Sequence, residues 1–243
     1  MVLVIFVGSI ASGKTSTARA LKKILTDRGF AAKYVDINVN HGFAYLLTRI
    51  IVSLLKYRYT GNYYLTIRFN NEDFFRKYLH FMQFLDALYI PVKYLVSLKT
   101  FMLFNKFRKR RYVILLDEYY LNSIVDHLYF ATRLCGPCSS IGGCTRFFYN
   151  LAFRVVLTSL KKDKALIIHM GRAFDESVRG WLLREKTRLV DENHVVFRDL
   201  ATRVLLKILK QYVGDNILFK SYMIREFAEA SMNVTKDVLE FVG

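Results

Sequence analysis

The chain has 243 residues and a mass of 28.5 kDa, and 53% of its residues are hydrophobic while 23% are charged. This length and composition suffice to bury a substantial core in one domain, which excludes an intrinsically disordered protein. The formal net charge is +17 and the isoelectric point is about 9.8. Such an excess of positive charge favours a polyanionic partner, and nucleotide phosphates, nucleic acid and an acidic membrane surface all fit that description.

The first part of the chain alternates between strand and helix patterns. Residues 2–7 (VLVIFV) form a continuous apolar run, which is typical of a strand buried on both faces. An amphipathic helix follows and ends near Gly29, where a C-capping glycine would stand. Residues 31–37 predict a second strand, and residues 43–55 predict a second helix because their apolar positions recur at helical spacing.

The middle of the chain is very apolar. After a polar break around residues 61–62, residues 72–107 predict two helices divided near Pro91. Charged residues interrupt this region, whereas a spanning helix needs about 20 nearly uncharged residues, so buried helices are favoured over a membrane location. The basic run KFRKRR (106–111) suits either the solvated end of a helix or a nucleic-acid patch.

The last part repeats the alternation. Expected elements are a strand at 112–118, helices at about 121–134 and 145–160, a strand at 164–170, a charged helical stretch at 176–212, a strand at 216–222 and a short helix at 235–242. Apolar strands that alternate with helices predict a three-layer α/β/α fold with a mainly parallel sheet of about five strands. No internal repeat or linker is evident, so we expect a single domain over residues 1–243.

Residues 8–15 (GSIASGKT) match the phosphate-binding loop pattern G-x-x-x-x-G-K-[ST] at every specified position, between the first strand and the first helix. Glycines let the backbone wrap around a phosphate with its N–H groups pointing inward, and the helix directs its positive end at the same anion. Lys14 can reach the β- and γ-phosphates, and the Thr15 hydroxyl can hold Mg²⁺. The loop residues expected to bind a nucleoside triphosphate are Gly8, Ser9, Ile10, Ala11, Ser12, Gly13, Lys14, Thr15 and Ser16.

Carboxylates follow two of the predicted strands. Asp117 and Glu118 end the strand VILLDE, at the edge where open α/β sheets place their active sites. Either carboxylate can act as a base, and Asp117 can hold Mg²⁺ together with Thr15. Asp36 ends the second strand and is a candidate for contacting an acceptor, although a turn-forming aspartate fits the same pattern.

Five segments together resemble a known family. They are GSIASGKT, LLDEYY (115–120), ALIIHM (165–170), DESVRGWLLREKTRL (175–189) and EASMNVTKDVLEFV (229–242). In this order they resemble the thymidylate kinase branch of the P-loop nucleoside-monophosphate kinases and, more distantly, the deoxynucleoside kinases. Only the P-loop matches residue by residue.

The resemblance implies ATP-dependent phosphoryl transfer, with Mg²⁺, to a small acceptor such as a nucleotide or nucleoside, in a cytoplasmic enzyme. It also implies a helical lid over roughly residues 172–190, whose arginines Arg184 and Arg188 stabilise the transferred group. In residues 229–242 it implies a small-residue loop beside the adenine and a last helix on the sheet.

The chain departs from that family at three places. DINVNHG (36–42) replaces an arginine-containing segment after the second strand, and Asp117-Glu118-Tyr119 replaces Asp-Arg-Tyr after the third. The middle-helix arginine that holds the acceptor phosphate has only Lys93 nearby. The resemblance therefore does not name the acceptor.

Other hypotheses stay open on the sequence. A basic P-loop NTPase could act as a nucleotide switch on nucleic acid or a membrane surface, and a kinase-like fold could bind nucleotide without catalysis. Cys135, Cys138 and Cys144, with His127 as a fourth ligand, fit a zinc site, a disulfide or plain loop cysteines. The sequence also leaves open whether the protein forms a homodimer.

Overall fold

The computed structural model describes residues 2–36, 42–58, 63–105, 111–117, 120–135, 143–162, 164–185, 191–213 and 217–243. Its strands are β1 (Val2–Gly8), β2 (Ala31–Asp36), β3 (Tyr112–Asp117), β4 (Lys164–Arg172) and β5 (Ile217–Ile224). They form one sheet in the order β2-β3-β1-β4-β5, and all four pairings are parallel. The predicted parallel five-stranded sheet is confirmed.

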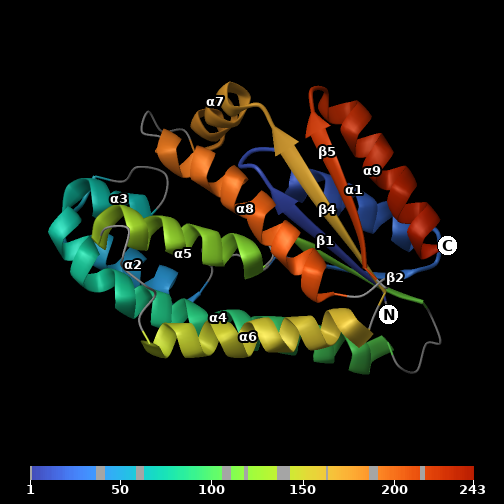
Figure 1. Ribbon diagram of the computed structural model, residues 1–243, viewed down its shortest axis with the longest axis horizontal. Coiled ribbons are helices and arrows are strands. Elements are labelled where there is room, and N and C mark those ends of the chain that lie inside the picture. Colours follow the sequence, from blue (N-terminus) through green and yellow to red (C-terminus); the bar gives the residue numbers. More distant parts are fainter. Residues whose placement is uncertain are drawn as a thin grey trace.

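Helices cover both faces of this sheet. They are α1 (Lys14–Asp27), α2 (Phe43–Leu54), α3 (Tyr63–Asn70), α4 (Glu72–Asn105), α5 (Tyr120–Cys135), α6 (Gly143–Lys162), α7 (Phe174–Glu185), α8 (Glu192–Tyr212) and α9 (Phe227–Val242). Figure 1 shows α5 and α8 in front of the sheet, and α1 behind it. The α/β/α layering is therefore as expected.

Burial on both faces explains why the central strands β1, β3 and β4 read as nearly continuous apolar runs, whereas the edge strands β2 and β5 are less buried. In β1, Leu3 and Ile5 join one core cluster while Val4 and Phe6 join the other, and all four are fully buried. Each such side chain stabilises the fold by about 1.5–3 kcal/mol relative to an exposed one. Because the strands are parallel, their carboxyl ends meet at one edge of the sheet, and this edge carries the loop between β1 and α1.

The prediction of two helices divided near Pro91 is wrong. Residues Glu72–Asn105 form the single helix α4, and Pro91 lies inside it. A proline inside a helix removes one backbone hydrogen bond and costs about 3 kcal/mol. Neighbouring Ala87 and Ile90 are almost fully buried, and α4 contacts α2, α3, α5 and α6, so tertiary packing offsets this cost.

Three further helical segments differ from the sequence expectation. The charged stretch 176–212 contains two helices, α7 and α8, and α3 was not expected. Helix α9 begins at Phe227, so residues 229–242 are helical throughout and contain no small-residue loop. Within the described parts of the chain, no helix combines the length and hydropathy needed to cross a membrane.

Candidate functional site

The loop between β1 and α1 has the backbone of an anion-binding nest. Gly8, Ala11 and Gly13 have positive φ angles of 125°, 55° and 79°. Alternation of left- and right-handed residues turns successive N–H groups toward one side. Glycine is also required for space, because a Cβ on Gly8 would lie 2.3 Å from the Met170 carbonyl oxygen. A Cβ on Gly13 would lie 2.3 Å from the Phe227 ring.

Lys14 lies over this loop with only 4% of its surface exposed. Its Nζ donates to the carbonyl oxygens of Ser9 at 2.5 Å and Gly8 at 3.3 Å. Helix α1, which begins at Lys14, has no acidic residue in its first turn, so no carboxylate of that turn reduces the positive end of the helix dipole. The loop and helix start therefore present a concentrated positive potential to an anion.

The structure places two of the predicted carboxylates, Asp117 and Asp36, at the same edge of the sheet as the loop. Asp117 is the register partner of Phe6 in β1 on one side and of Asp36 in β2 on the other. Asp117 is almost fully buried, and the Tyr34 hydroxyl donates to its Oδ2 at 2.8 Å. Burial, together with the Asp117 charge, raises the pKa of Tyr34 well above its usual value. Glu118 lies outside the described residues.

Thr15 and Asp117 fit the chemistry of a magnesium site. Both supply oxygen ligands, which Mg²⁺ prefers. Asp117 is the register partner of Phe6, which precedes the first loop residue, Gly8, by two positions. Among the described residues, no group of three or more His, Cys, Asp or Glu side chains could hold a metal ion. A cation between Thr15 and Asp117 would therefore take its other ligands from phosphate oxygens and water.

Of the four proposed zinc ligands, the structure describes the side chain of His127 alone, so the zinc hypothesis stays a prediction. Cys138 lies outside the described residues, and the side chains of Cys135 and Cys144 are not described. His127 is buried, with its Nε2 3.1 Å from Asp86 Oδ2. Burial raises the pKa of Asp86, and the contact with His127 opposes that rise. His127 therefore lies against a carboxylate of α4.

A cation and two aromatic rings gather near Asp36. The Nζ of Lys93 lies 5.5 Å from the centre of the Tyr89 ring, and Tyr89 makes an edge-to-face contact with Phe43 at 5.9 Å. Burial lowers the pKa of Lys93, while the Asp36 carboxylate acts in the opposite direction. Tyr89 and Phe43 were not singled out from the sequence, because they fall at helical core spacing.

The expected lid arginines remain a prediction. Arg184 lies in α7, but its side chain is not described, and Arg188 lies outside the described residues. Among the described residues, Arg172 at the carboxyl end of β4 reaches the loop, and its Nη1 donates to the Ala11 carbonyl oxygen at 2.8 Å. Sequence reasoning missed it, although its place at a strand end was an available signal.

A second outer contact holds the start of the loop. The Ser9 hydroxyl donates to Asp199 Oδ1 of α8 at 2.5 Å and accepts from the Arg172 backbone N–H at 3.2 Å. Asp199 also pairs with Arg203 at 2.8 Å, one helical turn later. Helix α8 and the end of β4 therefore both support the loop from outside. Asp199 carried no sequence signal.

Two of the surface hollows among the described residues are lined by helix side chains. A groove of about 620 Å³ runs between α1 and α9, and its lining includes Ile24, Phe227, Met232 and Leu239. Phe227 is the residue that packs on Gly13, so one end of this groove adjoins the loop.

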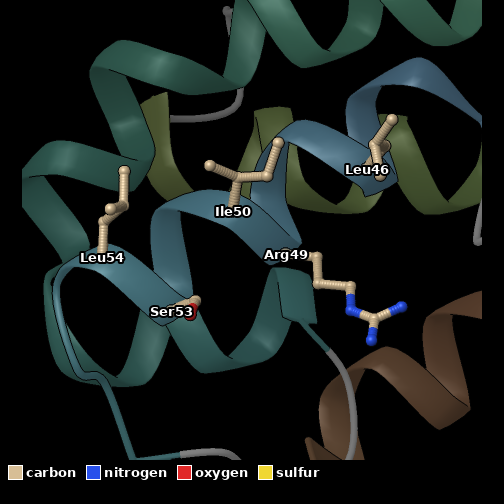
Figure 2. A pocket seen from close by; sticks show the side chains of 5 residues that line it. All are labelled: Leu46, Arg49, Ile50, Ser53 and Leu54. Atoms are coloured by element: carbon tan, nitrogen blue, oxygen red, sulfur yellow. The ribbon is translucent and has the colours of Figure 1, made fainter.

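The other hollow is formed by α2 alone. Figure 2 shows Leu46, Ile50 and Leu54 on one side of that helix, with Arg49 pointing elsewhere. None of its lining residues belongs to the loop or to a strand end, and it contains no carboxylate. The chemistry of the site therefore lies at the sheet edge.

Comparison with known proteins shows the fold. No protein-family model matches the chain, and no curated protein sequence matches it either. Among solved structures, the chain is similar to thymidylate kinase from Candida albicans, with a TM-score of 0.54 and 13% sequence identity. The match covers 99% of this chain and 93% of that one. The chain therefore has a thymidylate kinase-like fold, divergent in sequence.

Proposed function

We propose that this protein is an ATP-dependent kinase that transfers a phosphoryl group to a small acceptor, a nucleotide or a nucleoside, in the cytoplasm. The observation that carries the proposal is the register of three neighbouring strands. It sets the phosphate loop on β1 beside Asp117 on β3 and Asp36 on β2. Open α/β sheets bind their ligands at this edge, and the thymidylate kinase-like fold supports a nucleotide kinase.

The donor side is assigned to the loop. Its inward N–H groups and Lys14 would bind the β- and γ-phosphates of ATP and stabilise the charge that develops during transfer. Thr15 and Asp117 would hold Mg²⁺, which neutralises phosphate charge when it is bound. The base of ATP would lie toward Phe227, whose half-exposed ring adjoins both Gly13 and the α1–α9 groove.

The acceptor side is assigned to the cluster around Asp36. Lys93 provides a cation that could hold an acceptor phosphate, and Phe43 and Tyr89 provide ring faces for a base. Asp36 would accept a hydrogen bond from the acceptor or orient its nucleophilic oxygen. Lid arginines Arg184 and Arg188 would complete the site by covering the transferred group.

The test uses purified protein, Mg-ATP and a panel of nucleoside monophosphates and nucleosides. We expect formation of ADP that depends on one class of acceptor, and we expect the Asp117→Asn variant to need more Mg²⁺ for half-maximal rate. Normal ATP binding without acceptor-dependent ADP would overturn the proposal. ATP hydrolysis stimulated by RNA, DNA or anionic lipid vesicles in the absence of any acceptor would instead favour a nucleotide switch.

A further inference from the structure

The phosphate loop is fastened from outside to the first helix after β4. Arg172 donates from Nη1 to the Ala11 carbonyl oxygen at 2.8 Å and from Nε to Glu176 Oε2, in the first turn of α7, at 3.1 Å. Gly180 of α7 lies directly against Ala11, because a Cβ on Gly180 would be 2.7 Å from the Ala11 Cβ. One guanidinium and one close helix contact therefore join the loop to α7.

This contact controls the direction of a loop amide. Ala11 has a φ of 55°, a conformation that few residues other than glycine adopt. The Ala11 carbonyl and the Ser12 N–H belong to one planar trans peptide, so the two groups point in opposite directions. A guanidinium that binds this carbonyl from outside therefore aims the Ser12 N–H toward the inside of the loop, where a phosphate would lie.

We propose that Arg172 is a positioning residue that couples occupancy of the phosphate loop to α7. A phosphate that binds the Ser12 N–H fixes the peptide plane, and Arg172 transmits that orientation to Glu176 and the first turn of α7. The inference rests on the proposed function only in requiring that the loop binds a nucleotide. It does not depend on the acceptor or on turnover.

The chain contains a natural reporter of α7. Trp181 is its single tryptophan, follows Gly180 in α7 and is 4% exposed. Its ring packs edge-on against His194 of α8, with ring centres 5.8 Å apart. A shift of α7 against the loop and α8 therefore changes the surroundings of the indole, and its emission reports the shift.

The experiment compares tryptophan emission with calorimetric ATP binding. The full chain and its Arg172→Ala, Arg172→Lys and Glu176→Gln variants are titrated with Mg-ATP, and Arg154→Ala serves as the control because Arg154 is an exposed arginine of α6. We expect a saturable emission change in the wild type and the control at the ATP concentrations where heat is released. In Arg172→Ala we expect about tenfold weaker ATP binding and no emission change at saturation.

The two conservative variants separate positioning from charge. Lysine keeps the positive charge but cannot donate to Ala11 and Glu176 in the same fork-like way, so Arg172→Lys should bind ATP nearly normally and still lose the emission change. Glu176→Gln weakens only the contact between Arg172 and α7, so this variant should also bind ATP nearly normally and lose the emission change. It keeps the test valid if Arg172→Ala does not fold.

Three results would overturn the coupling. They are a wild-type emission that ATP saturation leaves unchanged, a full emission change in ATP-saturated Arg172→Ala, and a full change in both Arg172→Lys and Glu176→Gln. A wild type that does not bind ATP removes this proposal and the proposed kinase together. A coupled emission change without acceptor-dependent ADP removes only the kinase.

Discussion

Lys14 is a buried cation at the centre of the phosphate loop. Its ammonium group donates to the carbonyl oxygens of Ser9 and Gly8, and these bonds can be exchanged for phosphate oxygens when a nucleotide enters. A preorganised cation of this kind stabilises the developing charge of a transferred phosphoryl group more than it stabilises the ground state.

We therefore expect Lys14→Ala to lower kcat by about 10²–10³-fold, the range found when one preorganised charge-stabilising donor is removed. The fold should persist, since the substitution removes a buried charge and the helix gains a good helix former. Steady-state kinetics and near-ultraviolet circular dichroism measure the two effects. Lys22→Ala, an exposed lysine of α1, is the matched control, and an equal loss in both variants contradicts the assignment.

Lys93 distinguishes two classes of acceptor. A charge-assisted hydrogen bond to a phosphate contributes about 1.5–3 kcal/mol, which corresponds to about 10–100-fold in affinity. We expect Lys93→Ala to raise the KM for a nucleoside monophosphate by that factor and to leave the KM for ATP unchanged. Lys77→Ala, exposed on the same helix, should change neither constant. A KM for the nucleoside monophosphate that Lys93→Ala leaves unchanged would contradict the phosphate-binding role of Lys93.

At the scale of elements, the start of α8 depends on one buried carboxylate. Asp191 caps the helix by accepting from the His194 N–H at 3.3 Å, and it also accepts from the Tyr129 hydroxyl at 2.8 Å and pairs with Arg68 of α3. Asp191 and Arg68 are both largely buried. Because α8 also carries Asp199, which holds Ser9, this cap supports the functional site indirectly.

We expect Asp191→Ala to lower the free energy of unfolding by about 3 kcal/mol, because it removes a helix cap and leaves the Arg68 charge buried without its partner. Chemical denaturation monitored by circular dichroism measures this difference. Glu192→Ala, an exposed first-turn residue of the same helix, should change the free energy by less than about 1 kcal/mol.

The same pair predicts a pH dependence. Burial alone would raise the pKa of Asp191, but hydrogen bonds from Arg68 and Tyr129 outweigh it and hold the pKa below its ordinary value. The folded pKa is therefore lower than the unfolded value of about 3.9, so this stabilisation is complete above that value and disappears as pH falls through the folded pKa. The stability difference between wild type and Asp191→Asn should be largest near neutral pH and shrink under acid. A stability difference between wild type and Asp191→Asn that grows as pH falls would contradict this prediction.

The strands were predictable from the sequence, whereas several helix boundaries were not. The central strands β1, β3 and β4 are nearly uninterrupted apolar runs, although Lys33 and Lys220 interrupt the edge strands β2 and β5. Pro91 suggested a break, but the cost of a proline is small beside the burial of the half of α4 that precedes it and the packing of the partly buried Leu95 and Phe101 after it. The break between α7 and α8 lies in a segment of continuous helical composition. Only Asp191, a favourable capping residue before Glu192, marked the start of the second helix.

Part of the candidate site could also be predicted from the sequence, and part could not. The phosphate loop is a local motif, so its residues could be named from their spacing, and the strand-end position of Asp117 could be inferred from the strand pattern. Arg172 and Asp199, which contact the loop from outside, could not be predicted from the sequence. Arg172 and Ala11 are 161 positions apart, and Asp199 and Ser9 are 190 positions apart. Their contacts depend on β1 lying beside β4 and on α8 crossing the sheet, which is tertiary information.

At the scale of the whole molecule, one sheet links two cores. The cluster under α1 and α9 and the cluster under the other helices both draw alternate side chains from β1, β3 and β4. Loss of one core would expose one face of strands that the other core still needs. We therefore expect the single domain predicted from the sequence to unfold in one cooperative transition, in which calorimetric and van't Hoff enthalpies agree.

Nucleotide binding should shift that single transition as a whole. A ligand that binds only the folded state adds about 2.7 kcal/mol when its concentration is 100 times its dissociation constant, which for a chain of this size raises Tm by about 5–10 °C. Differential scanning calorimetry with Mg-ATP measures the shift. Lys14→Ala should reduce it strongly, because the loop loses its principal cation, while Lys22→Ala should retain it. Two transitions, of which Mg-ATP moves only one, would show that the phosphate loop belongs to a unit that folds separately from the rest of the chain.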